Sequence, residues 1–302
     1  MQIRKTIVLG LFLLLLAACG GSAPESEFVA DTAVPPPPST TIPATKTPPP
    51  LPATRPVDTA VPPTAAVEAT EMPTTEPASP ESPVADTDTS VSDVIIPGAE
   101  GLEMQATLSL PAGTPPFPGV ILLHMLGSDR QVWADNGFSQ LLADNGYAVL
   151  ALDMRGHGET GGSRDWDLAE EDLQMAWEWF TGLDEVDGGD TAVIGASIGS
   201  NMALITGANI PDIKTVILLS PGLDYRSVTT EDAIAAYGRR PVLIVASQED
   251  SYAADSSQTL ADLAEGEAKF IIYNGAGHGT NMFGPQPDLA PALVDWLNSY
   301  LQ

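Results

Sequence analysis

Short, continuous apolar runs alternate with helical patterns between residues 93 and 302. Each run has three to five residues, which is typical of a strand buried on both faces of a sheet. The runs are 120–123, 148–152, 192–194, 216–219, 242–245 and 270–273, and the helical patterns are 135–145, 165–181, 197–208, 255–265 and 288–301. In residues 102–110, apolar and polar side chains alternate, as they do in a half-exposed strand. This order predicts one α/β domain, residues 93–302, with a mostly parallel sheet covered by helices.

Proline marks a segment of a different kind. The 302-residue chain contains 28 prolines, and 17 of them lie between residues 20 and 92, together with 13 threonines. This segment has no apolar periodicity with which to form a core, and its proline runs favour extended polyproline II. We therefore interpret residues 19–92 as a disordered Pro/Thr-rich linker. It is either a passive spacer, or an O-glycosylated stalk or proline-rich ligand for a partner.

Residues 1–18 have the organisation of an export signal. Arg4 and Lys5 precede an apolar run, and small residues follow it. Roughly a dozen apolar residues are too few for a helix across a bilayer core of about 30 Å. The Leu-Ala-Ala-Cys sequence that ends at Cys19 resembles a bacterial lipobox, which implies cleavage after residue 18 and diacylglycerol on the Cys19 thiol. We expect an extracytoplasmic protein, lipid-anchored to the cell membrane. An ordinary signal peptide with a chance cysteine is the alternative.

Charge and composition exclude several functions. Twelve basic residues against 40 acidic ones give a formal net charge of −28, which would repel a nucleic-acid backbone. The single cysteine excludes an internal disulfide framework and a multi-cysteine metal site, and three histidines leave little room for a histidine-rich metal centre. We therefore expect no nucleic-acid partner, no metal and no cofactor.

Three of the predicted strands end in chemically unusual residues. A Gly-Ala-Ser-Ile-Gly sequence centred on Ser197 lies between a predicted strand and a helix. Such a sharp turn needs small residues around a central serine, and it exposes the hydroxyl at the helix N-terminus. Asp250 and His278 follow the last two predicted strands. Because ligands bind at the carboxyl ends of parallel strands, this edge is where we expect the chemistry.

In this order of nucleophile, acid and base, the domain resembles the α/β-hydrolase superfamily. The resemblance implies that Ser197 is the nucleophile, Asp250 the acid and His278 the base. His124 resembles the start of the family's oxyanion-hole loop, and residues 153–158 resemble a loop that packs near the site. The similarity is to lidless serine hydrolases, such as dienelactone hydrolase and carboxylesterases.

The expected chemistry is acyl transfer to serine. An imidazole must take the Ser197 proton as the hydroxyl attacks a carbonyl, and a carboxylate holds that imidazole in the correct tautomer. Backbone N–H groups then stabilise the oxyanion. The resemblance makes Ile198 one donor and places the second after His124. In that loop Met125 replaces the family's usual glycine, so we predict Leu126 as the second donor, with Met125 as the alternative.

Other residues compete for these roles. Glu249 adjoins Asp250, but its side chain should point the opposite way. Asp224 follows another predicted strand, where some relatives of the family carry the acid. His157 is a second candidate base, although a structural loop histidine is the simpler interpretation.

The substrate is less sharply defined. Only about twenty residues, 221–240, separate two predicted strands where members of the family often carry a lid, so we expect an open site. The domain has 30 acidic and 8 basic residues, a net charge of −22, which disfavours acyl-CoA and phosphate esters. An apolar acyl pocket is predicted from Met125, Met202, Tyr252, Met282 and Phe283.

The sequence therefore predicts a surface-tethered monomeric enzyme that cleaves small carboxylic esters. A serine peptidase or thioesterase of the same fold is one alternative. A non-catalytic surface binding lipoprotein is another, although a binding module has no need of Ser197, Asp250 and His278 together.

Overall fold

The computed structural model describes residues 88–301. The predicted signal peptide, Cys19 and residues 20–87 of the predicted linker lie outside the described residues. Within the described part of the chain, no helix combines the length and the apolar character needed to cross a bilayer.

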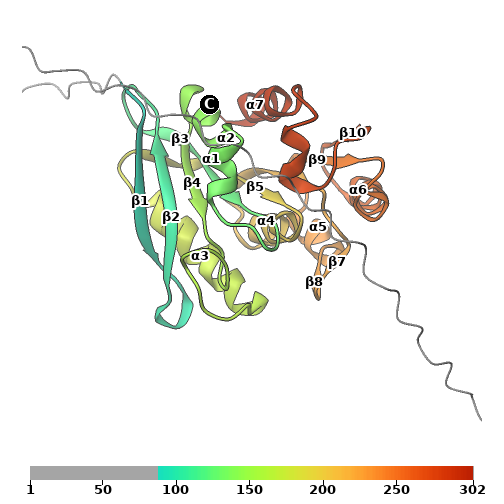
Figure 1. Cartoon of the computed structure of the whole chain (residues 1–302), viewed down its shortest axis with the longest axis horizontal. Coiled ribbons are helices and arrows are strands. Elements are labelled where there is room, and N and C mark those ends of the chain that lie inside the picture. Colours follow the sequence, from blue (N-terminus) through green and yellow to red (C-terminus); the bar gives the residue numbers. More distant parts are fainter. Residues whose placement is uncertain (1–87, 302) are drawn as a thin grey trace, which may run out of the picture. The chain divides into compact units, whose positions relative to one another are not determined.

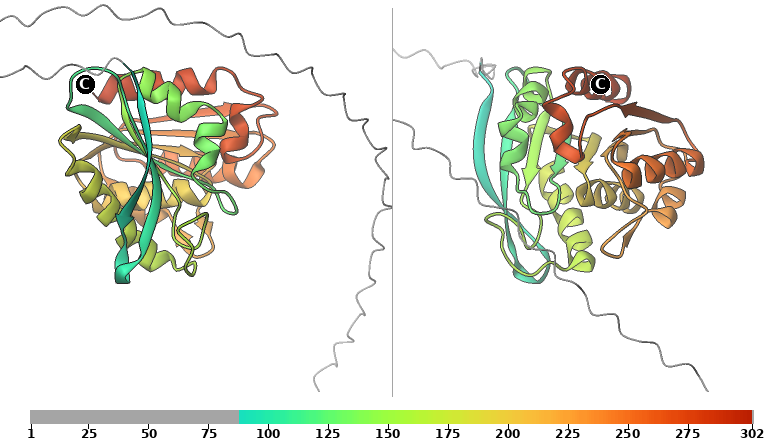
Figure 2. Two further views of the ribbon diagram at one scale, coloured as in Figure 1. Left: turned by 60° about the vertical axis from the view of Figure 1, so that its left-hand side comes forward. Right: turned by 45° about the vertical axis from the view of Figure 1, so that its right-hand side comes forward.

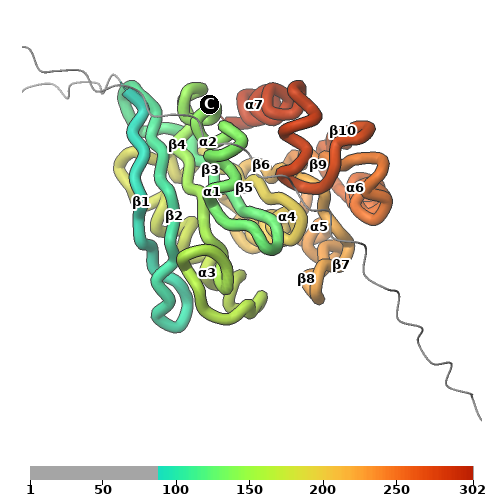
Figure 3. Tube along the Cα trace, in the orientation of Figure 1, coloured from blue at the N-terminus to red at the C-terminus, as the bar shows by residue number. Residues whose placement is uncertain are grey.

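An eight-stranded sheet runs through the centre of the domain, in the order β1-β2-β4-β3-β5-β6-β9-β10 (Figures 1 and 3). The strands are β1 (Ser90–Pro97), β2 (Glu103–Leu110), β3 (Phe117–Leu123), β4 (Ala148–Leu152), β5 (Val186–Ala196), β6 (Ile213–Leu219), β9 (Val242–Ser247) and β10 (Ala268–Tyr273). β2 pairs antiparallel with both β1 and β4, and every pair from β4 to β10 is parallel. The predicted mostly parallel sheet is confirmed.

Helices cover both faces of this sheet (Figure 2). The helices are α1 (Gln131–Asp135), α2 (Phe138–Asp144), α3 (Trp166–Thr181), α4 (Ile198–Asn209), α5 (Glu231–Tyr237), α6 (Ser251–Leu263) and α7 (Leu289–Tyr300). Alternate residues of β3 serve two cores. Ile121 and Leu123 join the core formed with α3, α4, α5 and α6, whereas Val120 and Leu122 join the core formed with α1, α2 and α7. Burial on both faces is the reason that the strands contain unbroken apolar runs.

The structure differs from the sequence prediction at two boundaries. β1 begins at Ser90 and pairs through Leu110, so the domain boundary at residue 93 falls inside a strand. This strand lies at the edge of the sheet, and six of its eight residues are exposed. The single helix expected at 135–145 is two helices, because Gly137 has a left-handed φ of 76° between α1 and α2.

The segment between β6 and β9 is short. It contains a two-stranded hairpin, β7 (Asp224–Tyr225) with β8 (Val228–Thr229), followed by α5. Neither element is large enough to form a cap domain over the carboxyl ends of the parallel strands.

Candidate active site

Ser197 lies in a sharp turn between β5 and α4. Its φ of 54° and ψ of −122° form a backbone conformation that is strained for a residue other than glycine. The turn is tight on both sides: a Cβ on Gly195 would lie 2.0 Å from the Gly199 carbonyl oxygen, and a Cβ on Gly199 would lie 2.5 Å from the Leu123 oxygen. Both glycines are therefore required by close backbone contact, as the strand–turn–helix prediction for this sequence demands.

Asp250 and His278 meet at the ends of the last two parallel strands. Asp250 precedes α6, and His278 precedes a 3-10 helix, η2 (Gly279–Phe283). The His278 Nδ1–H donates a hydrogen bond to Asp250 Oδ2 at 2.5 Å. This bond leaves Nε2 as the imidazole atom that is able to take a proton.

The turn that carries Ser197 lies against the loop that carries His278. A Cβ added at Gly279 would be 3.4 Å from the Ala196 Cβ, so the residue after the histidine and the residue before the serine are close neighbours. Within the described residues, no hydrogen bond joins Ser197 Oγ to His278 Nε2. Such a bond often tightens only when substrate is bound, and the backbone contact keeps the two groups at one edge of the sheet.

Neither competing carboxylate contacts His278. Glu249 accepts hydrogen bonds from the Ser247 hydroxyl at 2.9 Å and the Gly275 N–H at 2.6 Å. Those hydrogen bonds lower the pKa of Glu249, with the Gly275 N–H as the largest cause. Asp224 accepts from the Ser227 N–H within the β7–β8 hairpin. Of these three carboxylates, Asp250 is therefore the one that is hydrogen-bonded to His278.

Two backbone regions carry the N–H groups that the sequence predicts as oxyanion donors. Ile198 is the first residue of α4, where its N–H has no intrahelical acceptor. In the loop after β3, the Ser128 N–H donates to the Met125 carbonyl at 3.1 Å, and Gly127 has a left-handed φ of 76°. Leu126 therefore occupies the second position of a β-turn, and the hydrogen bond of the turn does not use its N–H.

Comparison with known proteins identifies the fold. The sequence profile for the alpha/beta hydrolase fold matches residues 118–236. Among solved structures, the domain is similar to DcsB in complex with a substrate analogue, with a TM-score of 0.63, 13% identity, and coverage of 70% of this chain and 99% of the other. It is also similar to dienelactone hydrolase from Anabaena variabilis, with a TM-score of 0.59, 18% identity, and coverage of 71% and 100%. It is similar to an esterase from Pyrococcus furiosus as well, with a TM-score of 0.61, 16% identity, and coverage of 70% of this chain and 92% of the other. The chain has the α/β-hydrolase fold.

One curated relative is similar in sequence over part of its length. Mouse acyl-coenzyme A thioesterase 3 is 29% identical over 126 residues, which cover 41% of this chain. The match spans 28% of the length of that thioesterase.

In the α/β-hydrolase domain, His124 and His157 are structural. The fully buried His124 donates from Nδ1 to the Met125 carbonyl at 2.9 Å, and its Nε2 accepts from the Met154 N–H at 3.1 Å. Both ring nitrogens are therefore occupied, and burial lowers the pKa of His124 to about 4. His157 Nδ1 lies 3.0 Å from the Arg155 carbonyl, the ring packs edge-on against His124, and burial lowers its pKa. Neither histidine is placed to act as the base.

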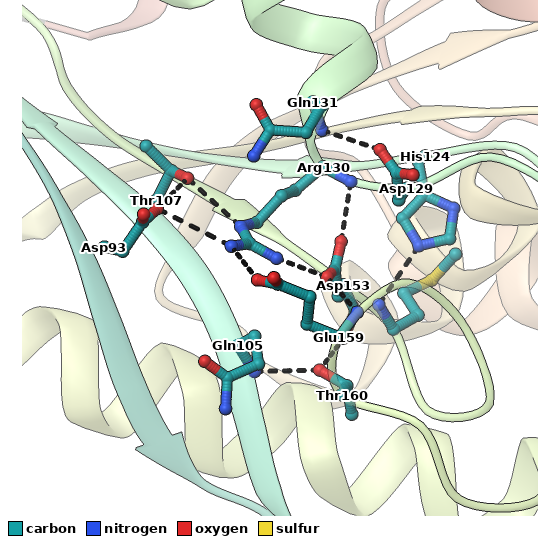
Figure 4. A network of polar contacts seen from close by, with 11 residues as sticks. Asp93, Gln105, Thr107, His124, Asp129, Arg130, Gln131, Asp153, Glu159 and Thr160 are labelled. Carbon is teal, nitrogen blue, oxygen red and sulfur yellow. Dashed lines mark hydrogen bonds and ion pairs between the residues drawn. The ribbon is translucent and has the colours of Figure 1, made fainter.

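Buried charges hold the loop at 153–158, which carries these contacts. The Arg130 guanidinium donates to Asp153, and Glu159 and Thr107 lie around the same group (Figure 4). The Asp153 carboxylate also accepts the Arg130 N–H at 2.7 Å and the Glu159 N–H at 2.8 Å. This network fixes the chain immediately before Met154, whose N–H binds His124.

The five residues predicted to line an acyl pocket do not come together in one place. Met202 and Met282 are fully buried in opposite cores, and Phe283 packs against Trp133 and Phe138. These residues support the fold because their apolar side chains fill the layers between helices and sheet. Tyr252 is 47% exposed, and Met125 lies over the loop that follows His278.

Tyr225 is a residue of the site that the sequence did not indicate. Its ring packs edge-to-face on His278, with centroids 6.2 Å apart, and on Tyr252, with centroids 5.6 Å apart. It lies in the β7–β8 hairpin, and no spacing in this part of the sequence places it near the histidine.

A separate groove of about 510 Å³ between α3 and α4 is lined by carboxylates, including Asp167, Glu170 and Glu178, and contains no nucleophile placed beside a base.

The α/β-hydrolase domain is expected to lose stability as the pH falls from 6.5 to 4. Burial lowers the pKa of His124 from 6.5 to about 4, so in this range the unfolded chain binds a proton that the folded chain does not. The free energy of unfolding therefore falls with pH, by roughly 3 kcal/mol over the interval at about 1.4 kcal/mol per pKa unit. Urea unfolding at a series of pH values measures this change. His124→Gln should flatten the dependence, and equal slopes in both proteins would contradict the prediction.

Proposed function

We propose that this domain is a serine hydrolase that cleaves small carboxylic esters through an acyl-enzyme intermediate. The observation that carries the proposal is the Asp250–His278 hydrogen bond beside the strained turn of Ser197. An imidazole hydrogen-bonded to a carboxylate, close to a serine at a helix N-terminus, is the arrangement that activates a weak nucleophile. A binding module has no use for it.

The proposed reaction has two steps. His278 Nε2 takes the Ser197 proton as Oγ attacks the ester carbonyl, and the Ile198 and Leu126 N–H groups stabilise the oxyanion. His278 then protonates the departing alcohol, which leaves the acyl group on Ser197. A water molecule, deprotonated by the same imidazole, attacks the acyl-enzyme and releases the acid. Asp250 stabilises the imidazolium in both steps without taking the proton itself.

The short segment between β6 and β9 and the charge of the domain favour small, uncharged esters. Only the β7–β8 hairpin and α5 stand where a cap would enclose a long substrate. A net charge of −22 on residues 93–302 repels polyanionic leaving groups. Two of the similar structures are called dienelactone hydrolase and esterase, which agrees with this class.

Thioester hydrolysis is the second candidate, because the curated relative is named as an acyl-coenzyme A thioesterase. The same triad is able to attack a thioester carbonyl. Coenzyme A carries phosphate groups, so its thioesters should react more slowly than p-nitrophenyl esters of the same acyl group. Because salt screens charge repulsion, added salt should narrow that difference.

A graded substrate panel tests the proposal. The full chain is assayed with p-nitrophenyl esters of increasing acyl length, with matched acyl-CoA thioesters, and with a fluorophosphonate probe that labels activated serines. We expect hydrolysis of the short esters and covalent labelling. If no ester or thioester is cleaved and no label is attached, the domain is a binding protein with a hydrolase fold.

We further propose that the enzyme is extracytoplasmic and is tethered to the cell membrane through a lipid on Cys19. The order of signal, linker and domain in the sequence supports this proposal. Cys19→Ser removes the acceptor thiol, so the variant should move from the membrane fraction to the soluble fraction while esterase activity per molecule is retained. Membrane association of the variant at the wild-type level would contradict the anchor.

A further inference from the structure

We propose that Ser220 is a positioning residue for the catalytic base, and that it fixes the position of the histidine relative to the nucleophile. The proposal rests on the proposed function, because it assigns a role within the same reaction. Ser220 follows β6 and does not contact the reacting atoms. It acts through the backbone of the loop that carries His278.

The environment of Ser220 is unusual for a serine at the end of a strand. The residue is fully buried, and its φ of 53° is left-handed. Such a conformation is strained for a residue with a side chain, so it persists only where other contacts hold it. Its hydroxyl accepts a hydrogen bond from the Gly279 N–H at 2.9 Å, across 59 residues of sequence. Gly279 is the residue immediately after His278.

The residue before Ser220 holds the nucleophile. The Ser197 N–H donates to the Leu219 carbonyl at 2.8 Å, and the Ser220 N–H donates to the Val245 carbonyl at 2.7 Å. Two consecutive residues at the end of β6 therefore bind the turn of the nucleophile and the loop of the base. A change in the position of one group relative to the other requires one of these bonds to break.

A second pair of side chains holds the other side of the same loop. The Ala276 N–H donates to the Ser247 hydroxyl at 3.0 Å, and the Gly275 N–H donates to Glu249 at 2.6 Å. Ser247 in turn donates to Glu249 at 2.9 Å. His278 thus lies between two anchored points, and only Gly277 separates it from Ala276. In this arrangement Glu249, the neighbour of Asp250 in the sequence, supports the loop that carries His278.

The loop needs these anchors because of its composition. Gly275, Gly277 and Gly279 all have left-handed φ values, of 64°, 85° and 57°. Glycine loses more conformational freedom on ordering than any other residue, so this loop is costly to hold in one conformation. Tyr225 adds a third support, since its hydroxyl donates to the Ser220 carbonyl at 3.2 Å while its ring packs on His278.

Ser220→Ala removes the acceptor of the Gly279 N–H and keeps the backbone. The buried N–H loses a partner, and we expect kcat to fall by about tenfold with KM unchanged, because substrate does not touch Ser220. Ser220→Gly removes the hydroxyl and also relieves the left-handed φ, so it folds even where alanine is strained. If the hydroxyl positions the base, both variants lose kcat. If Ser220 acts only through its backbone, Ser220→Gly retains the wild-type kcat, which would overturn the proposal.

Ser257→Ala is the matched control. Ser257 is another fully buried serine, and its hydroxyl has no partner in the part of the chain that the structure describes. Its replacement should leave kcat and the thermal midpoint unchanged. A loss of kcat in Ser257→Ala equal to that in Ser220→Ala would mean that any change in buried serine impairs the enzyme, and it would count against a specific role.

A spectroscopic measurement separates this proposal from the proposed function. The His278 Nδ1 proton, which is donated in a hydrogen bond to Asp250, is observed by NMR without turnover. In Ser220→Ala this resonance should broaden or exchange faster, whereas in Ser257→Ala it should match wild type. An unchanged resonance in Ser220→Ala overturns the proposal, even if kcat falls. If wild type hydrolyses nothing but the resonance still responds to Ser220→Ala, the proposed function fails and the positioning role stands.

Discussion

Ser197→Ala is expected to lower kcat/KM toward p-nitrophenyl esters by about 10⁴-fold or more and to abolish fluorophosphonate labelling. Alanine leaves no oxygen that is able to attack the ester carbonyl. The oxyanion donors at Ile198 and Leu126 remain, so slow residual hydrolysis by water is the most that the variant should show. Single-turnover assays and gel-based labelling of the full-length protein measure the two effects.

Ser139→Ala is the matched control for this variant. Ser139 in α2 is 8% exposed, the same fraction as Ser197, and it lies away from the strand ends that carry the candidate site. The control should keep wild-type activity and labelling. If Ser197→Ala retained either property, the nucleophile would be a different residue. Equal thermal midpoints in the two variants would show that the lost activity does not come from unfolding.

Asp250→Asn is expected to lower kcat by about 10³- to 10⁴-fold, because an amide favours the wrong tautomer of the neighbouring imidazole. The asparagine NH₂ group cannot accept the His278 Nδ1–H, so the ring is free to place its proton on Nε2, the atom that must act as base. Its shape is nearly that of aspartate, so the loop should keep its fold. The kcat of the purified full-length variant on the preferred ester measures this effect.

Glu249→Gln provides the comparison within the same turn. Glutamine keeps an oxygen that is able to accept the Gly275 N–H, so this variant should lose about tenfold or less in kcat. The reverse order, with Glu249→Gln the more damaging substitution, would transfer the role of acid to Glu249. Equal losses would indicate that the two carboxylates act through the loop rather than through the imidazole.

Several features of the fold and of the candidate site can be predicted from short segments of the sequence. The apolar runs predict the parallel strands because burial on both faces leaves no polar position within them. The Gly-Ala-Ser-Ile-Gly sequence predicts the turn at Ser197, since no larger residue fits beside the Gly199 backbone. Ser197, Asp250 and His278 each follow a predicted strand, so their order along the chain is visible in the sequence. These are properties of short segments, so a single sequence is enough to read them.

Other features depend on contacts between residues far apart in the chain. The hydrogen bond between Gly279 and Ser220 joins residues 59 apart, and nothing in either segment alone marks it. Tyr225 reaches His278 only because the β7–β8 hairpin folds over the strand ends. Methionines assigned to an acyl pocket are buried in two cores, because an apolar side chain is equally suited to either place. Strand composition therefore predicts the sheet and the edge where the chemistry lies. The supports of His278 arise when β5, β6 and β9 come together, since a hydrogen bond between loops has no periodicity in the sequence.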